Sequence, residues 1–421
     1  MTTIRSQPGV EPGLLGTVDE TPSAAGTGTR PPLADRALAQ RVRAVPPSGI
    51  RRFFDILATM EDVISLGVGE PDFDTPPQII EAGVRSLRSG RTHYTSNYGT
   101  IELRRTLADH LQRRYGVSYD PARELLITVG ASEAVDLALR ATCDPGDEVV
   151  LHEPSYVAYA PAVIFAGGVV RHVSTRLDDD FALDPAAVEA AITPRTKALF
   201  LGYPCNPTGA VLPDEVQDEL ARIADRYDLL VYSDEIYDRL AYGTYRHRAF
   251  SSLPGMRDRT ILAGGFSKAY AMTGWRVGYL AAPAAILEGI VKVHQYGIMS
   301  APTTAQDAAL VALTAGEADV ERMLAEYDRR RRMFVEELNK LGLTTFEPRG
   351  AFYAFPQITS TGLDSETFAQ RLLVEERVAV VPGNAFGPSG EGHVRACYAT
   401  SYEQLEEALL RIGRFVERHR A

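Results

Sequence analysis

Short apolar segments alternate with amphipathic segments between residues 120 and 282. Seven of the apolar segments have the length and composition of β-strands, at 125–129, 148–152, 169–173, 198–202, 229–233, 260–264 and 277–281. Helical periodicity separates most of them, as at 132–141 and 213–227. This alternation is typical of an α/β fold, so we predict a central, mostly parallel seven-stranded sheet.

The connection between the last two predicted strands is unusually short. About a dozen residues join 260–264 to 277–281, too few for a comfortable parallel crossover. We therefore expect strand 277–281 to be antiparallel within the otherwise parallel sheet. In such sheets, ligands bind at the carboxyl ends of the strands.

The two ends of the chain show other patterns. Residues 1–35 are rich in Thr, Pro, Gly, Ser and Ala without an apolar period, which predicts a disordered tail. An amphipathic helix is expected at 50–60 and a long helix at 317–341. The arginine run 329–332 wraps around that long helix, so we expect most of these four arginines to lie in solvent.

Strand signals at 351–355 and 378–381 and a closing helix at 402–418 predict a second, smaller α+β domain. The domain organisation expected from these patterns has four parts: a disordered tail at 1–35, an N-terminal arm with part of the small domain at 36–75, a large domain at 76–312, and a C-terminal small domain at 313–421.

Charge and composition exclude several classes of protein. The 44 basic and 55 acidic residues give a net charge of −11, which disfavours a general nucleic-acid binder. No run approaches the ~18 apolar residues of a membrane span, and no secretory signal is visible. The three cysteines are widely spaced, which argues against a disulfide framework. The sequence has no paired-histidine motif, which argues against a metal site. A cytoplasmic protein that binds neither nucleic acid nor membrane is expected.

Lysine is scarce in this chain. Of the 44 basic residues, 40 are Arg, and the four lysines are Lys197, Lys268, Lys292 and Lys340. Arginine stays protonated at any working pH, whereas lysine can become a neutral nucleophile. Lys268 is the only one of the four in a Gly/Ser-rich turn at the end of a predicted strand, so it is the best candidate for a reactive amine.

The segment Gly130-Ala131-Ser132-Glu133-Ala134 follows a strand and opens a helix, and three interpretations remain open. It nearly matches the GxSxG nucleophile elbow of serine hydrolases, with Ala134 in place of the last glycine. Its backbone N–H groups and the Ser132 hydroxyl could instead bind a phosphate. Ser132 could also simply cap the helix.

Three further residues lie beside predicted strand ends. Asn206 begins an NPTG turn, Asp234 ends a buried strand, and Arg276 follows Lys268 by eight residues. Each has an ordinary explanation by itself, as a turn, a cap or a surface cation. A carboxylate at the end of a buried strand is nevertheless desolvated unless a cation is near.

In this order, the motifs resemble those of class I/II aminotransferases, which are enzymes of fold type I that depend on pyridoxal 5′-phosphate (PLP). The resemblance spans about residues 47–415 and is most specific in GFSKAYAMTGWRVG. LGVGEPDFDTP, HYTSNYGTIELR, NPTG and YSDEIY follow the family's order, most closely that of its prokaryotic aspartate, alanine and aromatic enzymes. The resemblance implies a large and a small domain, and a homodimer that uses an amino acid and a 2-oxo acid.

The resemblance also implies the residues that hold the cofactor. Lys268 matches the lysine that forms the Schiff base and moves the proton, and Asp234 matches the partner of the pyridine nitrogen. Asn206 and Tyr237 match the residues that bind the phenolate oxygen, and Tyr156 matches the aromatic residue stacked on the ring. The phosphate site would be formed by Gly130, Ala131, Ser132, Arg276 and, from the neighbouring subunit, Tyr94.

Substrate binding follows from the same resemblance. Arg395 matches the arginine that binds the substrate α-carboxylate, together with Asn206 and the backbone N–H of Gly69. Two positions depart from the family. Gly265 replaces a serine that binds the phosphate in many relatives, so this donor is lost or Ser267 replaces it. Ser132 stands where some aspartate enzymes have lysine.

These departures bear on the substrate. No arginine lies between Arg276 and Arg322, where well-known aspartate enzymes supply a cation for the second carboxylate. We therefore expect neutral aromatic or aliphatic donors to be preferred to aspartate, with 2-oxoglutarate or pyruvate as acceptor, unless His294 or Arg349 supplies the cation. The alternatives are an aspartate aminotransferase, a PLP-dependent β-lyase, a serine hydrolase built on Ser132, and a non-catalytic PLP-binding regulator.

Overall fold

The computed structural model describes residues 33–47 and 60–420. Most of the tail predicted at 1–35 and almost all of the helix predicted at 50–60 therefore lie outside the described residues. Two short helices form the described N-terminal segment, α1 (Leu33–Ala37) and α2 (Gln40–Arg43). Residues 33–35, assigned to the tail from the sequence, belong to α1 instead.

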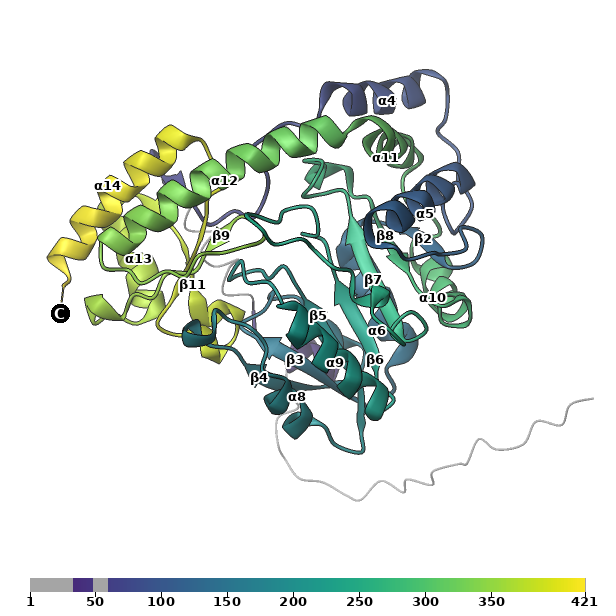
Figure 1. The fold of residues 1–421 in the computed structure, drawn as a ribbon, viewed down its shortest axis with the longest axis horizontal. Coiled ribbons are helices and arrows are strands. Elements are labelled where there is room, and N and C mark those ends of the chain that lie inside the picture. Colours follow the sequence, from purple (N-terminus) through teal and green to yellow (C-terminus); the bar gives the residue numbers. More distant parts are fainter. Residues whose placement is uncertain (1–32, 48–59, 421) are drawn as a thin grey trace, which may run out of the picture.

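A seven-stranded sheet forms the centre of the larger part of the molecule (Figure 1). In spatial order its strands are β2 (Leu125–Thr128), β8 (Gly278–Ala281), β7 (Thr260–Gly265), β6 (Leu230–Asp234), β5 (Thr196–Gly202), β3 (Glu148–Glu153) and β4 (Val169–Ser174). All neighbours pair in parallel except β8, which is antiparallel to both β2 and β7. The α/β fold and the antiparallel last strand are thus confirmed.

Alternating side chains of the strands reach opposite faces of this sheet. In β5, Ala198 and Phe200 pack into one apolar cluster, while Leu199 and Leu201 pack into another. The first face is covered by α6 (Gly130–Thr142), α7 (Tyr159–Phe165) and α10 (Ala284–Gly297). The second is covered by α5 (Ile101–Tyr115), α8 (Pro185–Ala191), α9 (Asp214–Arg226) and α11 (Thr303–Ala315), with α4 (Pro77–Arg88) packed on α11. Helices on both faces bury the parallel sheet, as this sheet type requires.

A smaller α+β unit is formed by the C-terminal part and a short N-terminal segment. Its strands are β1 (Ile64–Ser65), which pairs in parallel with β10 (Val378–Ala379), and the antiparallel set β11 (Val381–Pro382), β12 (Val394–Cys397) and β9 (Tyr353–Ala354). Its helices are α12 (Glu317–Lys340), α13 (Ser365–Glu376) and α14 (Tyr402–Arg418). The domain boundaries at residues 75 and 312 stay a prediction.

Six short 3₁₀ helices complete the described secondary structure: η1 (Leu177–Asp179), η2 (Phe250–Ser252), η3 (Thr273–Trp275), η4 (Thr359–Thr361), η5 (Gly383–Phe386) and η6 (Pro388–Gly390). Of these, η3 matters most for function, because it lies between Lys268 and Arg276.

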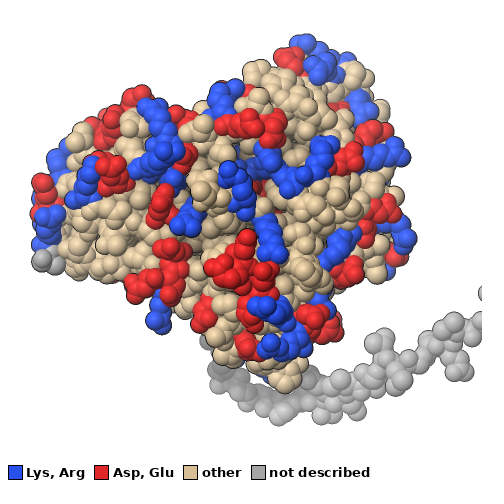
Figure 2. All heavy atoms as spheres, in the orientation of Figure 1, with Lys and Arg blue, Asp and Glu red and all other residues tan. Residues whose placement is uncertain are grey.

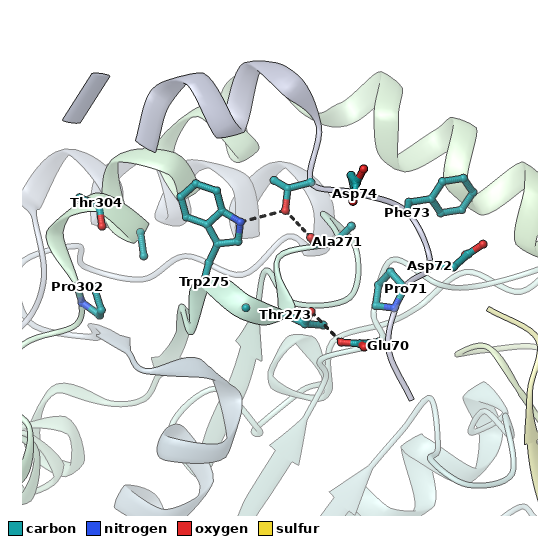
Figure 3. Close-up of a pocket in the computed structure, with 13 residues that line it drawn as sticks. Glu70, Pro71, Asp72, Phe73, Asp74, Ala271, Thr273, Trp275, Pro302 and Thr304 are labelled. Carbon is teal, nitrogen blue, oxygen red and sulfur yellow. Dashed lines mark hydrogen bonds between the residues drawn. The ribbon is translucent and has the colours of Figure 1, made fainter. Parts of the chain in front are cut away.

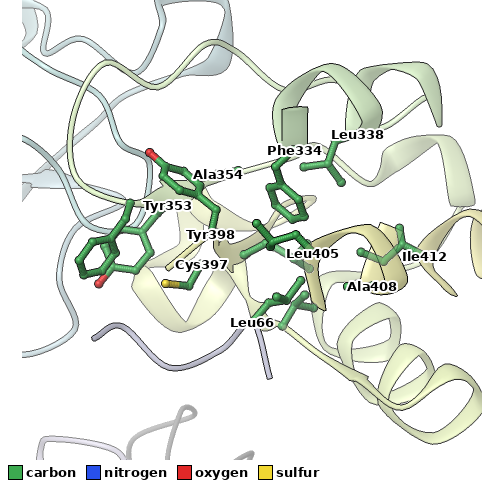
Figure 4. Close-up of a cluster of buried hydrophobic side chains, with 14 of the residues drawn as sticks. Leu66, Phe334, Leu338, Tyr353, Ala354, Cys397, Tyr398, Leu405, Ala408 and Ile412 are labelled. Atoms are coloured by element: carbon green, nitrogen blue, oxygen red, sulfur yellow. The ribbon is translucent and has the colours of Figure 1, made fainter. Parts of the chain in front are cut away.

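The smaller unit has its own apolar core, to which both the segment around β1 and the C-terminal part of the chain contribute. Leu66, directly after β1, packs among side chains of α12, β12 and α14, including Phe334 and Leu405 (Figure 4). All three side chains are fully buried. This packing fixes the start of the segment that leads from β1 to α4.

The arginine run in α12 differs from the sequence-based expectation. Arg329 and Arg332 are exposed, but the side chains of Arg330 and Arg331 are only 7% and 4% exposed. The expectation of a mostly solvated run was therefore wrong for half of it. Both buried guanidiniums find carboxylates: Arg330 bonds to Asp72 and Glu326, and Arg331 to Asp328 and Glu347. Paired in this way, a buried cation is tolerated.

Basic and acidic side chains are interspersed over the face of the molecule seen in Figure 2. Within residues 33–47 and 60–420, no helix is both long and apolar enough to cross a membrane.

The core of the smaller unit gives a stability prediction within one helix. Leu405 is 0% exposed and Leu410, also on α14, is 63% exposed. Leu405→Ala should lower the free energy of unfolding by about 2–5 kcal/mol, because it leaves a cavity. Leu410→Ala should change it by no more than about 0.5 kcal/mol. Denaturant unfolding of the two variants measures both values, and equal losses would contradict the packing described here.

Candidate functional site

A cavity of about 500 Å³ lies where the carboxyl ends of β5, β6 and β7 meet the smaller unit. The sheet side contributes Asn206, Asp234 and Lys268, and the smaller unit contributes Tyr353 and Arg395. This is the edge of a parallel sheet at which ligands are expected, because the chain leaves the strands there and exposes polar groups.

Lys268 lies in the turn after β7 and donates a hydrogen bond from Nζ to the carbonyl oxygen of Gly69, at 2.5 Å. Its amine also lies 5.7 Å from the centre of the Tyr237 ring. Burial lowers the pKa of Lys268 to about 8, and the Arg395 guanidinium acts in the same direction. A substantial fraction of this amine is therefore neutral near pH 8, as a nucleophile or a base requires.

Asp234, the last residue of β6, is a buried carboxylate with two hydrogen-bond donors. The Tyr159 hydroxyl donates to Oδ2 at 2.9 Å, and the Ile236 N–H donates to Oδ1 at 3.1 Å. Burial raises the pKa of Asp234 to about 6, and the two donors oppose that rise. The carboxylate is thus ionised at neutral pH and would attract a cationic ligand atom.

Arg395 on β12 joins the smaller unit to the sheet side. Its Nη1 donates to Asn206 Oδ1 at 2.8 Å, and its Nη2 donates to the Gly67 carbonyl at 2.6 Å. The guanidinium lies 4.6 Å from the centre of the Tyr353 ring, and its buried Nε has no hydrogen-bond partner among the described residues. An unpaired, buried guanidinium N–H indicates a site for an anionic ligand.

Tyr353 on β9 connects several of these groups. Its hydroxyl lies 2.7 Å from the hydroxyl of Tyr237, and both side chains are buried. A Cβ atom on Gly69 would overlap the Tyr353 hydroxyl. A side chain at position 69 would therefore force the Tyr353 hydroxyl to move away from Tyr237 or the chain around residue 69 to shift.

The opposite end of the cavity can bind an anion. Ala131 and Ser132, in the first turn of α6, line it together with Arg276. Gly130 has a φ of +77°, and a Cβ there would lie 2.9 Å from Arg276 Nη2. Arg276 donates Nη1 to the Thr273 carbonyl and has no carboxylate partner among the described residues. A free guanidinium beside a helix N-terminus is a favourable environment for a phosphate.

The cavity brings together most of the site residues expected from the sequence. It is lined by Gly69, Ala131, Ser132, Tyr156, Asn206, Asp234, Tyr237, Lys268, Arg276 and Arg395. Gly130 lies directly beside Arg276, whereas Tyr94 is 82% exposed and lies on a separate surface hollow. Ser267, the alternative phosphate donor, also lines the cavity.

Two residues considered as extra cations do not line the cavity. His294 is fully buried and lies 2.8 Å from Glu133, and Arg349 is exposed in a segment without helix or strand. In this chain they do not supply a cation to the cavity. Lys268, Arg276 and Arg395 are its only basic lining residues within the described ranges.

The interpretations of Ser132 other than anion binding lose support. Ser132 lies inside α6, whose N-cap residue is Val129, so it does not cap the helix. No histidine lines the cavity formed by the described residues, so the Ser–His pair of a serine hydrolase is absent there. Residues 33–47 and 60–420 also contain no cluster of three or more His, Cys, Asp or Glu side chains that could hold a metal ion.

Sequence analysis missed Tyr159, Tyr353 and Glu70 as lining residues. Tyr159 follows Tyr156 by three residues and is the first residue of α7, so the repeated tyrosine is a signal that could have been used. Tyr353 and Glu70 come from segments whose approach to the cavity depends on the packing of the smaller unit, so no local pattern indicates it.

Comparison with known proteins identifies the family. The family model for aminotransferase class I and II matches residues 61–412. An aspartate aminotransferase of Pyrococcus abyssi is 47% identical over 89% of this chain and 97% of its own length. Aromatic-amino-acid aminotransferase 2 of Thermococcus litoralis is 43% identical over 90% of this chain and 98% of its own.

Two solved structures support the same family. The aspartate aminotransferase of Thermus thermophilus with maleate has a TM-score of 0.85 and 42% identity, over 90% of this chain and 99% of that one. An aromatic aminotransferase of Pyrococcus horikoshii has a TM-score of 0.84 and 46% identity, over 88% and 99%. Family model, relatives and structures all extend across both parts of the molecule. The chain belongs to the class I and II aminotransferases, with the fold of the PLP-dependent type I enzymes.

Proposed function

We propose that this aminotransferase uses PLP to move the amino group of an L-amino acid with an uncharged side chain to a 2-oxo acid such as 2-oxoglutarate or pyruvate. The observation that carries the proposal is the convergence of Lys268, Asp234 and Arg395 on one cavity. The amine of Lys268 can attach the cofactor covalently, and the buried carboxylate of Asp234 can pair with a cationic ring. The guanidinium of Arg395 can bind the carboxylate of the substrate.

The residues of the cavity fit PLP. Its phosphate suits Arg276 and the first turn of α6, and its pyridine nitrogen suits the buried carboxylate of Asp234. Its phenolate oxygen suits the hydroxyl of Tyr237 and the side-chain amide of Asn206, whose oxygen is already bonded to Arg395. Tyr156 supplies an aromatic ring at the wall of the same cavity.

When bound, PLP supplies an electron sink that stabilises negative charge on the substrate Cα. The protein's part is positioning and proton transfer. Lys268 provides the amine for attachment and then a base whose pKa of about 8 suits the removal of a Cα proton. Asp234 holds a proton on the ring nitrogen by its negative charge. Arg395, with Asn206 and the Gly69 N–H, orients the substrate carboxylate so that the Cα–H faces Lys268.

The basic groups of the cavity favour a substrate with one carboxylate. Arg276 is assigned to the phosphate, Lys268 to the cofactor and Arg395 to the α-carboxylate, which leaves no cation among the described lining residues for a second one. Glu70 adds a negative charge at the mouth. An unpaired buried carboxylate is costly. Aspartate remains the second candidate for the amino donor, because two relatives named as aspartate aminotransferases are 47% and 42% identical to this chain.

A homodimer is part of the proposal. Tyr94, Tyr296, Ile298 and Met299 are large apolar residues that are 82%, 88%, 50% and 43% exposed. His93 and Tyr94 share a surface hollow with the segment 300–303. Such exposed aromatic residues are typical of interfaces, so a second subunit would cover them and could receive Tyr94 at its phosphate site. Three free, buried cysteines fit the cytoplasmic location expected from the sequence.

The role of Lys268 can be tested by covalent trapping. Lys268→Ala should bind PLP without attachment and lose turnover by several orders of magnitude, because anchor and base are removed together. Borohydride reduction of the wild type followed by peptide mapping should place the label on Lys268. The exposed Lys292 is the matched control, and Lys292→Ala should keep both label and activity. A label on another lysine would overturn the assignment.

The role of Asp234 can be tested through Tyr159. Tyr159→Phe removes a donor to the ionised carboxylate, so the pKa of Asp234 should rise further above its usual range. Loss of such a hydrogen bond costs about 1.5–3 kcal/mol, which corresponds to a rise of about 1–2 pH units. The acid limb of the kcat/KM profile should move upward accordingly. Tyr203→Phe is the control, since its hydroxyl donates to the Phe181 carbonyl at 3.3 Å and should leave the profile unchanged.

The substrate class is measured by kcat/KM for aspartate, glutamate, alanine, phenylalanine and tyrosine with one shared acceptor. Phenylalanine, tyrosine or alanine should exceed aspartate by about tenfold or more, which corresponds to about 1.4 kcal/mol. A tenfold lead for aspartate would show that a cation from another source reaches the site. Turnover without any 2-oxo acid would favour the β-lyase.

A further inference from the structure

Residues 67–75, which we call the strap, join β1 to α4, and the first four of them line the cavity. The strap contains no helix or strand, and within the described residues its main chain makes no hydrogen bond to another main-chain group. Just before it, Leu66 is fixed by main-chain bonds to Ala379 and Cys397. The position of the strap therefore depends on side-chain contacts.

Hydrogen bonds and ion pairs hold the strap to the rest of the molecule at five of its residues. Arg395 donates to the Gly67 carbonyl at 2.6 Å, and Lys268 donates to the Gly69 carbonyl at 2.5 Å. Thr273 donates to Glu70 at 3.2 Å, and Arg330 donates to Asp72 at 2.8 and 2.9 Å. The Thr75 hydroxyl donates to the Ala271 carbonyl at 2.6 Å and accepts from Trp275 Nε1 at 3.0 Å. Figure 3 shows Glu70, Asp72 and Ala271 around a second cavity of about 550 Å³, which shares Glu70 and Thr273 with the first.

These contacts are not equally permanent. Lys268 and Arg395 are the groups that the proposed function gives to the cofactor and to the substrate carboxylate, so both ligands compete with the strap for them. The contact between Glu70 and Thr273 is exposed and long for an O–H donor. Thr75 holds only the last residue of the strap. Among the described residues, Arg330 is therefore the one hydrogen-bonding partner in the middle of the strap that ligand binding does not withdraw, beside the edge-on packing of Phe73 on Tyr327.

The surroundings of Arg330 make this contact strong. Its side chain is 7% exposed and that of Asp72 is 25% exposed. The guanidinium also donates Nε to Glu326 at 3.0 Å, and it lies 5.2 Å from the centre of the Phe73 ring and 5.8 Å from that of Tyr327. A buried cation that loses its carboxylate is strongly destabilised. The packed helix α12 thus provides a fixed base for Asp72.

We propose that Arg330 is a positioning residue for the substrate site. Through Asp72 it holds the strap in place, so that the main-chain groups of Gly67 and Gly69 stay beside Arg395 while ligands occupy Lys268 and Arg395. This inference rests on the proposed function of those two residues. It assigns a role in substrate binding to a buried arginine that does not line the cavity.

The test compares Arg330→Gln and Asp72→Asn with Arg332→Gln in the holoenzyme. Arg332 is the matched control, because it is on the same helix, is 70% exposed and, among the described residues, bonds only to Asp328. Asp72→Asn breaks the same contact from its more exposed side, so a result is obtained even where Arg330→Gln folds poorly. Cleavage of the strap by chymotrypsin after Phe73, amide hydrogen exchange of α12, bound PLP, KM and kcat are measured for each.

Both strap variants should be cleaved faster after Phe73 while the amides of α12 keep their protection from exchange, and both should retain PLP. KM for the amino acid should rise about tenfold with kcat within about threefold, because the strap supports substrate binding equally in the ground and transition states. The double variant should be no worse than either single one. Arg332→Gln should match the wild type.

Two results would overturn the proposal. One is an unchanged KM with loss of protection throughout α12, which would make Arg330 a purely structural residue. The other is unchanged cleavage after Phe73, which would mean that the strap does not depend on this contact. A wild type with PLP bound but no transamination would instead refute the proposed function, and the cleavage measurement would still report on the strap.

Discussion

Burial of opposite charges at the ends of two neighbouring strands is the constraint on which the site depends. Asp234 ends β6 and Lys268 follows β7, its parallel neighbour, so the topology alone brings a carboxylate and an amine to one edge. Burial raises the pKa of Asp234 to about 6 and lowers that of Lys268 to about 8. The two shifts have one cause, and together they leave an anion and a partly neutral amine available near neutral pH.

The smaller unit completes the site from the other side of the cavity. Arg395 and Tyr353 come from adjacent strands β12 and β9, whose pairing fixes their relative position. Their bonds to Asn206 and Tyr237 reach across to the sheet side. Leu66, packed in the core of the smaller unit, fixes the start of the strap. The position of the substrate groups thus depends on packing between segments far apart in the sequence, and not on either unit alone.

The sequence predicted the central sheet well, because strands buried on both faces have a continuous apolar pattern with clear ends. Most of the residues proposed for cofactor and substrate could be named from motif order. The burial of Arg330 and Arg331 could not be predicted, because a charged run looks solvated unless its distant partners Asp72 and Glu347 are known. Tyr159 was missed for a related reason: its bond to Asp234 joins residues 75 positions apart.

Before ligands bind, the strap supplies hydrogen-bond acceptors to the few basic side chains of the cavity. The cavity holds two guanidiniums that stay protonated and a single amine that can lose its proton. In the structure, carbonyl oxygens of the strap accept hydrogen bonds from Lys268 and Arg395, so neither buried side chain is left without a partner. Ligand groups would compete with these carbonyls, and a carboxylate could in addition accept from the unpaired Nε of Arg395. Apart from that one donor, binding is an exchange of hydrogen-bond partners, which keeps its net cost low. The released carbonyls must in turn find other donors, and this requires the strap to stay in place by contacts outside the cavity.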